Sequence, residues 1–115
     1  MEIINFDDFK KIEIRIGKII SAQKVEDSSK LLKLQVDFGP DEEKPGQTIQ
    51  RQILAGIAKF YEPEILVGKL CPFVFNLEPK IMGDNESQGM ILCADDGGPV
   101  LLHPDKEIKP GSIIK

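Results

Sequence analysis

The chain has 115 residues, of which 41% are hydrophobic and 30% charged, and it can therefore fold as one soluble domain with a modest core. No segment approaches the roughly 20 consecutive apolar residues of a membrane span, and Glu2, Asp7 and Asp8 exclude a secretory signal peptide, so we expect a cytoplasmic protein that does not bind membranes. The net charge of −4 opposes binding to an anionic polymer, but residues 9–80 carry twelve Lys and Arg against ten Asp and Glu.

The first predicted strand covers residues 12–20, where isoleucines alternate with charged residues in the period of two that is typical of a half-buried strand. The alternation changes phase at Gly17, which predicts a bulge or a sharp bend at that residue. One bent strand can then belong to two sides of a small barrel. The second strand, residues 31–38, and the third, residues 47–55, are separated by a polar loop with three consecutive carboxylates.

One helix is predicted over residues 58–67, because Pro63 lies near its first turn. A loop is predicted at residues 79–88, where polar residues and glycine interrupt the apolar pattern. The remaining strands are predicted at residues 70–77, 89–94 and 100–102.

Five main strands, with one short helix between the third and the fourth, are the element order of an OB-fold, an all-β, five-stranded Greek-key barrel. Such barrels bind oligonucleotides or oligosaccharides on the face of their second and third strands. We therefore expect a single domain over residues 1–115, with the barrel core at about 12–95 and extensions at 1–11 and 96–115.

The sequence contains no pattern that is typical of an enzyme or of a metal site. The single histidine, His103, lies in a loop bounded by proline and is more typical of a solvated side chain than of a general base. Cys71 and Cys93 are 22 residues apart and have no histidine at ligand spacing, so we interpret them as reduced, packed thiols. We expect no catalytic activity, no metal and no cofactor.

Basic residues recur where the predicted strands would bring them to one side of the barrel. This arrangement is compatible with a groove that follows a phosphate backbone, and equally with an ordinary solvent-facing surface. The residues concerned are Lys30, Lys33, Arg51, Lys59 and Lys80.

The polar segment 86–90, which leads into an apolar strand, is the least ordinary stretch of the chain. Ser87 could hydrogen-bond a base edge or a phosphate, and Met90 could pack against a base. The alternative is a simple turn followed by a core methionine. Asn76 is open to the same two interpretations, since an amide within a strand suits a base contact but also a cap or a bulge.

Taken together, five segments resemble the tRNA-binding domain family, which includes the C-terminal domain of bacterial methionyl-tRNA synthetases and a stand-alone bacterial tRNA-binding protein. The resemblance covers residues 5–115 and depends on residues 9–19, 30–36, 55–69, 76–83 and 86–90. It implies an OB-fold without catalytic activity, which binds tRNA by its shape and forms homodimers through segments outside the barrel. The positions that match the binding residues of the family are Lys30, Lys33, Arg51, Lys59, Asn76, Lys80, Ser87 and Met90.

The resemblance implies that the Lys and Arg side chains hold phosphates, while Asn76, Ser87 and Met90 contact sugars or base edges. It also implies a tRNA-binding homodimer, either free or appended to a methionyl-tRNA synthetase, with a synthetase as a candidate partner. Two features depart from the family: the acidic loop at 41–48, which could repel RNA, and Glu78, which stands where relatives commonly carry a basic residue. The alternatives are a peptide-binding export chaperone of a related subfamily and a pure dimerisation module.

Overall fold

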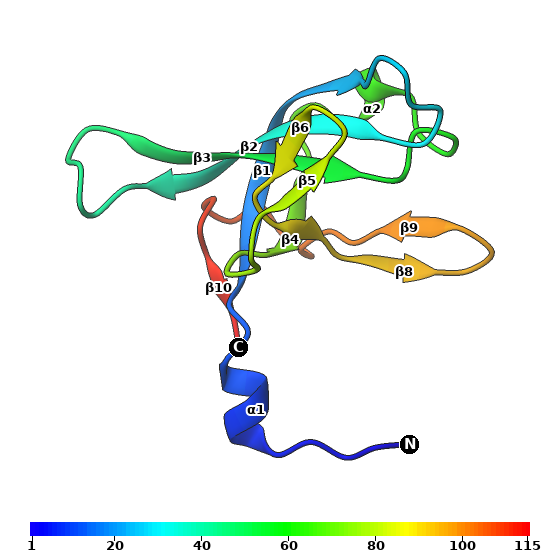
Figure 1. Cartoon of the computed structure of the whole chain (residues 1–115). Coiled ribbons are helices and arrows are strands. Elements are labelled where there is room, and N and C mark those ends of the chain that lie inside the picture. The colour runs from blue at the N-terminus through cyan, green and yellow to red at the C-terminus, as the bar shows by residue number, and fades with distance from the viewer.

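A curled antiparallel sheet forms most of the structure, and the computed structural model describes all residues from 1 to 115 (Figure 1). Its strands are β1 (Ile14–Lys24), β2 (Leu32–Pro40), β3 (Thr48–Ala55), β4 (Leu70–Val74), β7 (Met90–Ile91) and β10 (Ile113–Ile114). The strand order is β3-β2-β1-β4-β7, and β10 pairs with the start of β1. Because β1 pairs with both β2 and β4, it is the central strand about which the sheet bends.

The barrel closes where residues 86–89 return alongside the free edge of β3. The backbone N–H of Gln88 donates to the carbonyl of Gln52 at 2.8 Å. Two side chains complete the edge, since the N–H of Gln52 donates to Gln88 Oε1 and the N–H of Leu54 donates to Ser87 Oγ, both at 3.0 Å. Residues 85–91 therefore lie between β3 and β4, which is the closure expected of an OB-fold and confirms the predicted fold class.

The core lies inside this barrel. The four alternate apolar residues of β2 are at most 1% exposed, as their period of two predicts. The rings of Phe73 and Phe75 pack edge-on against Phe38, with centroids 5.4 and 5.0 Å apart. These contacts hold β4 against β2 across the barrel.

The bend in β1 is present, but its position differs from the prediction. The register between β1 and β2 slips by one residue at Ile20, so that the bulge lies three residues beyond Gly17. Gly17 itself is buried, and an added Cβ would collide with Cγ1 of Val36 and lie 2.8 Å from Cε1 of Phe38. The glycine is needed for close packing of β1 against the core rather than for the bulge.

The predicted helix over 58–67 is wrong in extent, because the helix α2 covers only Pro63–Leu66. Glu62 precedes the proline and adopts an extended conformation, with φ −73° and ψ 141°. The ring of a proline disfavours the helical conformation in the residue before it, so no helix can run through Glu62. Residues 57–61 form a tight turn instead, in which the N–H of Tyr61 donates to the carbonyl of Ile57 at 3.1 Å.

The predicted loop at 79–88 and the predicted strand at 89–94 are also corrected. The loop contains a hairpin of β5 (Lys80–Met82) and β6 (Asn85–Ser87), which turns at Gly83 with φ +63°. The strand divides into β7 and β8 (Cys93–Asp95), and β8 leaves the barrel to pair with β9 (Pro99–Leu101). Three-residue strands carry too few residues for a clear alternation, so their pattern is lost in the sequence.

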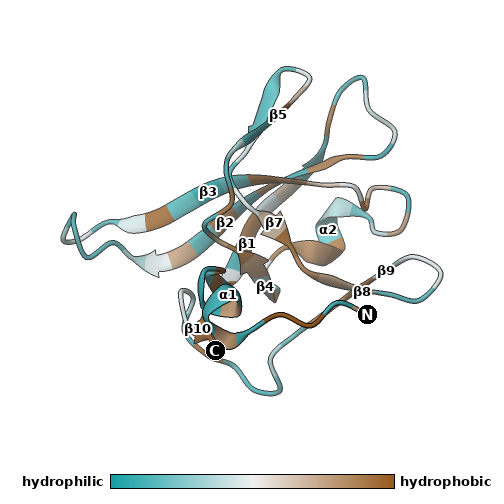
Figure 2. Cartoon of the chain, turned by 60° about the horizontal axis from the view of Figure 1, so that its bottom comes forward, coloured by the Kyte–Doolittle hydropathy of each residue, from teal (hydrophilic) through white to brown (hydrophobic).

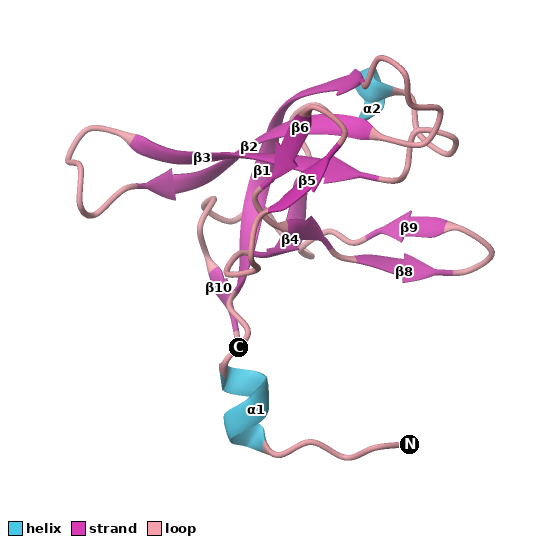
Figure 3. Ribbon diagram, in the orientation of Figure 1, coloured by secondary structure: helices cyan, strands magenta, loops and turns pink.

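A short helix, α1 (Phe6–Lys10), precedes β1 in a segment for which no helix was predicted. It projects away from the barrel and buries none of its residues (Figures 1 and 3). At the other terminus, the tail crosses the end of β2 and joins β1, where the N–H of Gly111 donates to the carbonyl of Ile16 at 2.7 Å. Neither α1 nor α2 has the length and apolar character that crossing a bilayer would demand.

We predict that Gly17→Ala destabilises the protein by about 1–3 kcal/mol, the usual cost of overpacking a filled core. The added methyl would displace Val36 and Phe38, both of which are themselves buried. Denaturant unfolding measures the difference, with Gly56→Ala as a matched control, because no atom lies within 4 Å of a Cβ at Gly56. Equal stability of the two variants would contradict this packing role.

Candidate nucleic-acid interface

A cleft of about 640 Å³ opens at the end of the barrel where β3 meets the residues that follow β4. Its volume falls within the roughly 300–1,000 Å³ of small-ligand sites. One arginine and two glutamates supply its charges. The lining residues are Glu13, Arg51, Phe75, Asn76, Leu77, Glu78, Pro79 and Gln88.

Arg51 is the basic side chain that lines the cleft. Arg51 and the buried Ile53 are two residues apart in β3 and therefore share the face of the strand that points into the barrel. The side chain of Arg51 lies over the end of the core. The Nη1 group donates to the backbone carbonyls of Phe75 and Gln88, and Cζ lies 3.6 Å from the centroid of the Phe75 ring. Burial and the nearby Arg15 guanidinium lower the pKa of Arg51, whereas Glu13 raises it. A guanidinium stays charged at neutral pH even so.

A second guanidinium shares the same aromatic ring. Arg15 Cζ lies 4.2 Å from the centroid of Phe75, and its Nε is 3.1 Å from a carboxylate oxygen of Glu13. Phe75 is only 8% exposed, because it packs against Phe38 in the core and the two arginines lie over its ring. Cation–π contacts of this kind fix the planes of the guanidinium groups.

Asn76 fastens the start of β1 to the end of β4. Its Oδ1 accepts from the N–H of Glu13 at 2.8 Å, and its Nδ2 donates to the carbonyl of Lys11 at 2.7 Å. The side chain is exposed at the rim of the cleft while both ends of its amide have partners within the chain. Its contact with a sugar or base stays a prediction.

Ser87 is 3% exposed and belongs to the closure of the barrel. Its hydroxyl accepts from the N–H of Leu54 and donates to the carbonyl of Gly89, both at 3.0 Å. Next to it, Gln52 Nε2 donates to the carbonyl of Glu86 at 3.0 Å. These bonds fix the segment that carries Gln88 into the cleft, and a direct contact of Ser87 with RNA is likewise untested.

The lysines lie along the outer side of the barrel. Lys33 is on the outer face of β2, opposite Leu54, while Lys30 and Lys59 come together at the start of β2, where the N–H of Ala58 donates to the carbonyl of Lys30 at 3.0 Å. Lys80 is exposed on β5, opposite Ser87. The predicted positions thus form one group near the cleft and one at the opposite end of β2, with Lys33 between them.

Met90 stands apart from both groups. It is 45% exposed and pairs with Val74 at the edge formed by β4 and β7. Because its neighbour Ile91 is buried, the alternation of the strand directs Met90 to the outside.

Two side chains that organise the cleft, those of Arg15 and Phe75, were not predicted from the sequence as part of a site. Arg15 alternates with isoleucines, which is the pattern of a half-buried strand whose charged residues face solvent. The tail covers that isoleucine face instead, where Ile16, Ile108 and Ile114 border a common cavity. Arg15 consequently points into the barrel end, and the pairing of two arginines with one phenylalanine has no signal in the linear sequence.

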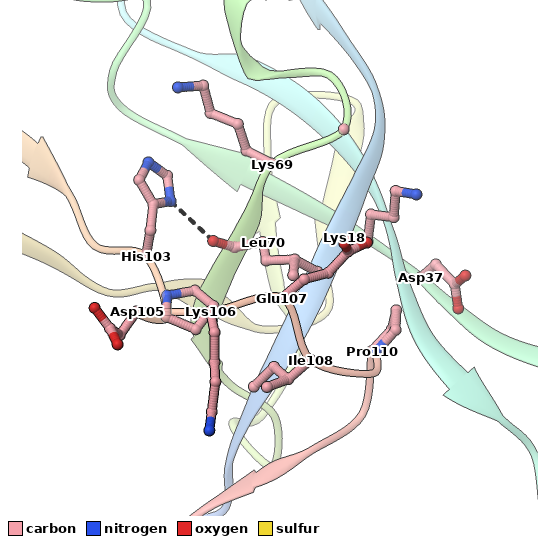
Figure 4. Close-up of a pocket in the computed structure, with 12 residues that line it drawn as sticks. Lys18, Asp37, Lys69, Leu70, His103, Asp105, Lys106, Glu107, Ile108 and Pro110 are labelled. Atoms are coloured by element: carbon pink, nitrogen blue, oxygen red, sulfur yellow. Dashed lines mark hydrogen bonds between the residues drawn. The ribbon is translucent and has the colours of Figure 1, made fainter.

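A second cleft, of about 470 Å³, lies between β1, residues 68–70 and the tail (Figure 4). His103 Nδ1 is 2.9 Å from the carbonyl oxygen of Leu70 there. Lys18, Lys69 and Lys106 point in different directions out of this cleft (Figure 4). Its cations do not converge on one position, so we place the candidate site at the first cleft.

The two cysteines are free, as predicted, and lie outside both clefts. Burial, and to a lesser extent the neighbouring Cys93, raises the pKa of Cys71 to about 11, although Lys69 opposes this shift. Burial also raises the pKa of Cys93. Both are therefore protonated thiols at neutral pH. No group of three or more His, Cys, Asp or Glu side chains is arranged to hold a metal ion.

The family described as "Putative tRNA binding domain" matches residues 14–113, and the chain therefore belongs to this family, as its segments predicted. The methionine–tRNA ligase of Methanosarcina mazei is 47% identical over 117 residues and matches 100% of the chain, which spans only 15% of that relative's length. A MetRS related protein from Pyrococcus horikoshii is 37% identical, with a TM-score of 0.86 over 100% of both chains. The chaperone CsaA of Bacillus anthracis is 32% identical, with a TM-score of 0.84 over 99% of this chain and 100% of that chain.

We predict that Ser87→Ala destabilises the protein by about 1–3 kcal/mol, because it leaves the buried N–H of Leu54 without an acceptor. Thermal and denaturant unfolding measure the effect. Ser29→Ala is the matched control, since Ser29 is exposed and its hydroxyl has no partner in the chain. If Ser87→Ala unfolds like the control, the hydroxyl does not secure the barrel closure.

Proposed function

We propose that the protein binds structured tRNA without catalysing a reaction, either as a free protein or as an appendage of a methionyl-tRNA synthetase. One observation carries the proposal: a polar strip runs along the outside of the barrel in a protein that is acidic overall. It passes from Lys30 and Lys59 through Lys33 to the Gln35–Gln52 pair, whose side chains are 3.0 Å apart. Membership of a tRNA-binding family supports the same assignment.

The lysines of the strip would bind phosphates, because mobile ammonium groups follow a backbone without reading its sequence. Lys33 is the central member, since it lies on β2 between the two ends of the strip. Lys80 would extend the contact to the β5–β6 hairpin, and the exposed Met90 would pack against a sugar or base. In this proposal, Asn76 and Ser87 border the RNA-binding surface and also stabilise it through their hydrogen bonds to the backbone.

We further propose that the protein is a homodimer. Ile3, Phe6 and Ile113 are 84%, 70% and 59% exposed, and they belong to the N-terminal segment and the C-terminal tail. Figure 2 shows the hydrophobic colour along the N-terminal segment that leads to α1. Exposed apolar surface of this kind marks protein–protein contacts, and an isolated five-residue helix is too short to persist without a partner. A second copy would give two binding surfaces and hence avidity.

Peptide binding is the second candidate function, and one finding favours it. A structural neighbour at 32% identity is named a chaperone. The net charge of −4 also suits a polypeptide ligand better than RNA. Competition between tRNA and an unfolded polypeptide for the same protein separates the two functions, because tRNA should displace the polypeptide only if both occupy the strip.

We predict that tRNA binding weakens steeply between about 50 and about 200 mM salt, since phosphate contacts release counterions. Lys33→Glu should lower the affinity at least about tenfold without changing the fold. The control, Lys44→Glu, makes the same charge change in the loop between β2 and β3, away from the strip, and should retain most of the affinity. Gel-shift titration measures both, and salt-independent or absent binding would contradict the proposal.

We predict that Phe6→Glu combined with Phe9→Glu converts the dimer to a folded monomer, because two carboxylates would be buried at the contact. Light scattering after size exclusion measures the mass. Ile65→Glu, a charge placed on the exposed hydrophobic residue of α2, should leave the dimer intact. A wild-type protein that elutes as a monomer at micromolar concentration would rule out this assembly.

A further inference from the structure

The guanidinium of Arg51 is fixed as a flat platform at the border of the cleft. Its Nη1 is held by two backbone carbonyls, and Phe75 lies 3.6 Å from Cζ. A side chain held in this way cannot move to follow a phosphate, as a surface lysine can. It can, however, present a planar group to the cleft that it lines, and guanidinium planes are surfaces on which unstacked bases bind.

The charges of the cleft disfavour a phosphate. Arg51 is the one basic residue among its lining residues, whereas Glu13 and Glu78 both contribute carboxylates. Glu13 is neutralised by Arg15 at 3.1 Å, but none of the ion pairs in the structure involves Glu78. An anionic group would meet an unpaired carboxylate at the rim. The amino group of a base would instead meet an acceptor, since carboxylates accept from exocyclic amines.

The remaining walls suit a flat, partly apolar ligand. Leu77, which is 45% exposed, and Pro79 line the cleft between Asn76 and the β5–β6 hairpin. They offer apolar surface at its rim, while Arg51, backed by the ring of Phe75, provides a planar cation. A nucleobase matches this combination of apolar walls, stacking platform and acceptor.

We propose that this cleft binds a single unstacked nucleobase that carries an exocyclic amino group, stacked on Arg51 with its amine toward Glu78. The inference rests on the proposed tRNA binding and assigns Arg51 a role other than the phosphate contact that the resemblance implied. The polar strip binds the RNA backbone, and the cleft selects for a base exposed at a corner of the folded RNA. Glu78 becomes a determinant of specificity.

The direct test follows the Nε–H signal of Arg51 by NMR in the full chain. Cytidine, adenosine and guanosine, which carry an amino group and no phosphate, should shift this signal, and uridine should shift it less. Inorganic phosphate should leave it unchanged. Glu78→Gln, at an exposed position, should reduce the difference between cytidine and uridine. A shift with phosphate alone, or no shift with any nucleoside, would overturn the proposal.

A second test uses tRNA and separates the cleft from the strip. Arg51→Lys keeps the charge but removes the plane, so it should lower the affinity at least about fivefold and leave the salt dependence unchanged. Lys33→Gln should reduce the salt slope by about one. Thermal unfolding and the amide spectrum establish that each variant is folded. An Arg51→Lys variant that binds like the wild type would overturn the base-stacking role.

The two tests also distinguish this inference from the proposed function. If nucleosides shift Arg51 but the wild type does not bind tRNA, the cleft is a base site and the tRNA proposal fails. If tRNA binds with the expected salt dependence and nucleosides leave Arg51 unchanged, tRNA binding stands and the cleft proposal fails.

Discussion

The closure of the barrel by residues 86–89 is the constraint on which the other features depend. The edge of β3 would otherwise leave its N–H groups at Gln52 and Leu54 unpaired, and side chains from Gln88 and Ser87 satisfy them. The same return of the chain carries the carbonyl of Gln88 to Arg51. One set of hydrogen bonds therefore completes the fold and fixes the platform of the cleft.

Local arrangement, rather than net charge, determines what this acidic protein can bind. The three consecutive carboxylates of the β2–β3 loop lie at the far end of a long hairpin that projects from the barrel (Figure 1). The lysines lie nearer the start of β2, at Lys30 and Lys33. At physiological salt, charges separated by more than about 8 Å are largely screened from each other. An acidic loop tip and the lysines of the polar strip can therefore coexist on one small barrel.

The sequence was sufficient for the barrel but not for its cleft. The period-two pattern of β2 predicted its buried face correctly, because one side of that strand lies in the core and the other in solvent. In β1 the same pattern does not identify the face that points into the barrel. The tail covers the isoleucine face, and Arg15 points inward to Phe75. Such contacts join residues far apart in the chain. Pro63 shows the opposite case, in which a local rule that shortens the helix was available in the sequence.

The central claim is that RNA binds along the outside of β2 and in the cleft that the barrel closure forms. Mapping of backbone amide shifts with and without tRNA tests it most directly. The account predicts changes at Lys33, Gln35 and Gln52 and around Arg51 and Gln88, with β8 and β9 unaffected. Changes confined to α1, to the β8–β9 hairpin or to the cleft beside His103 would contradict it.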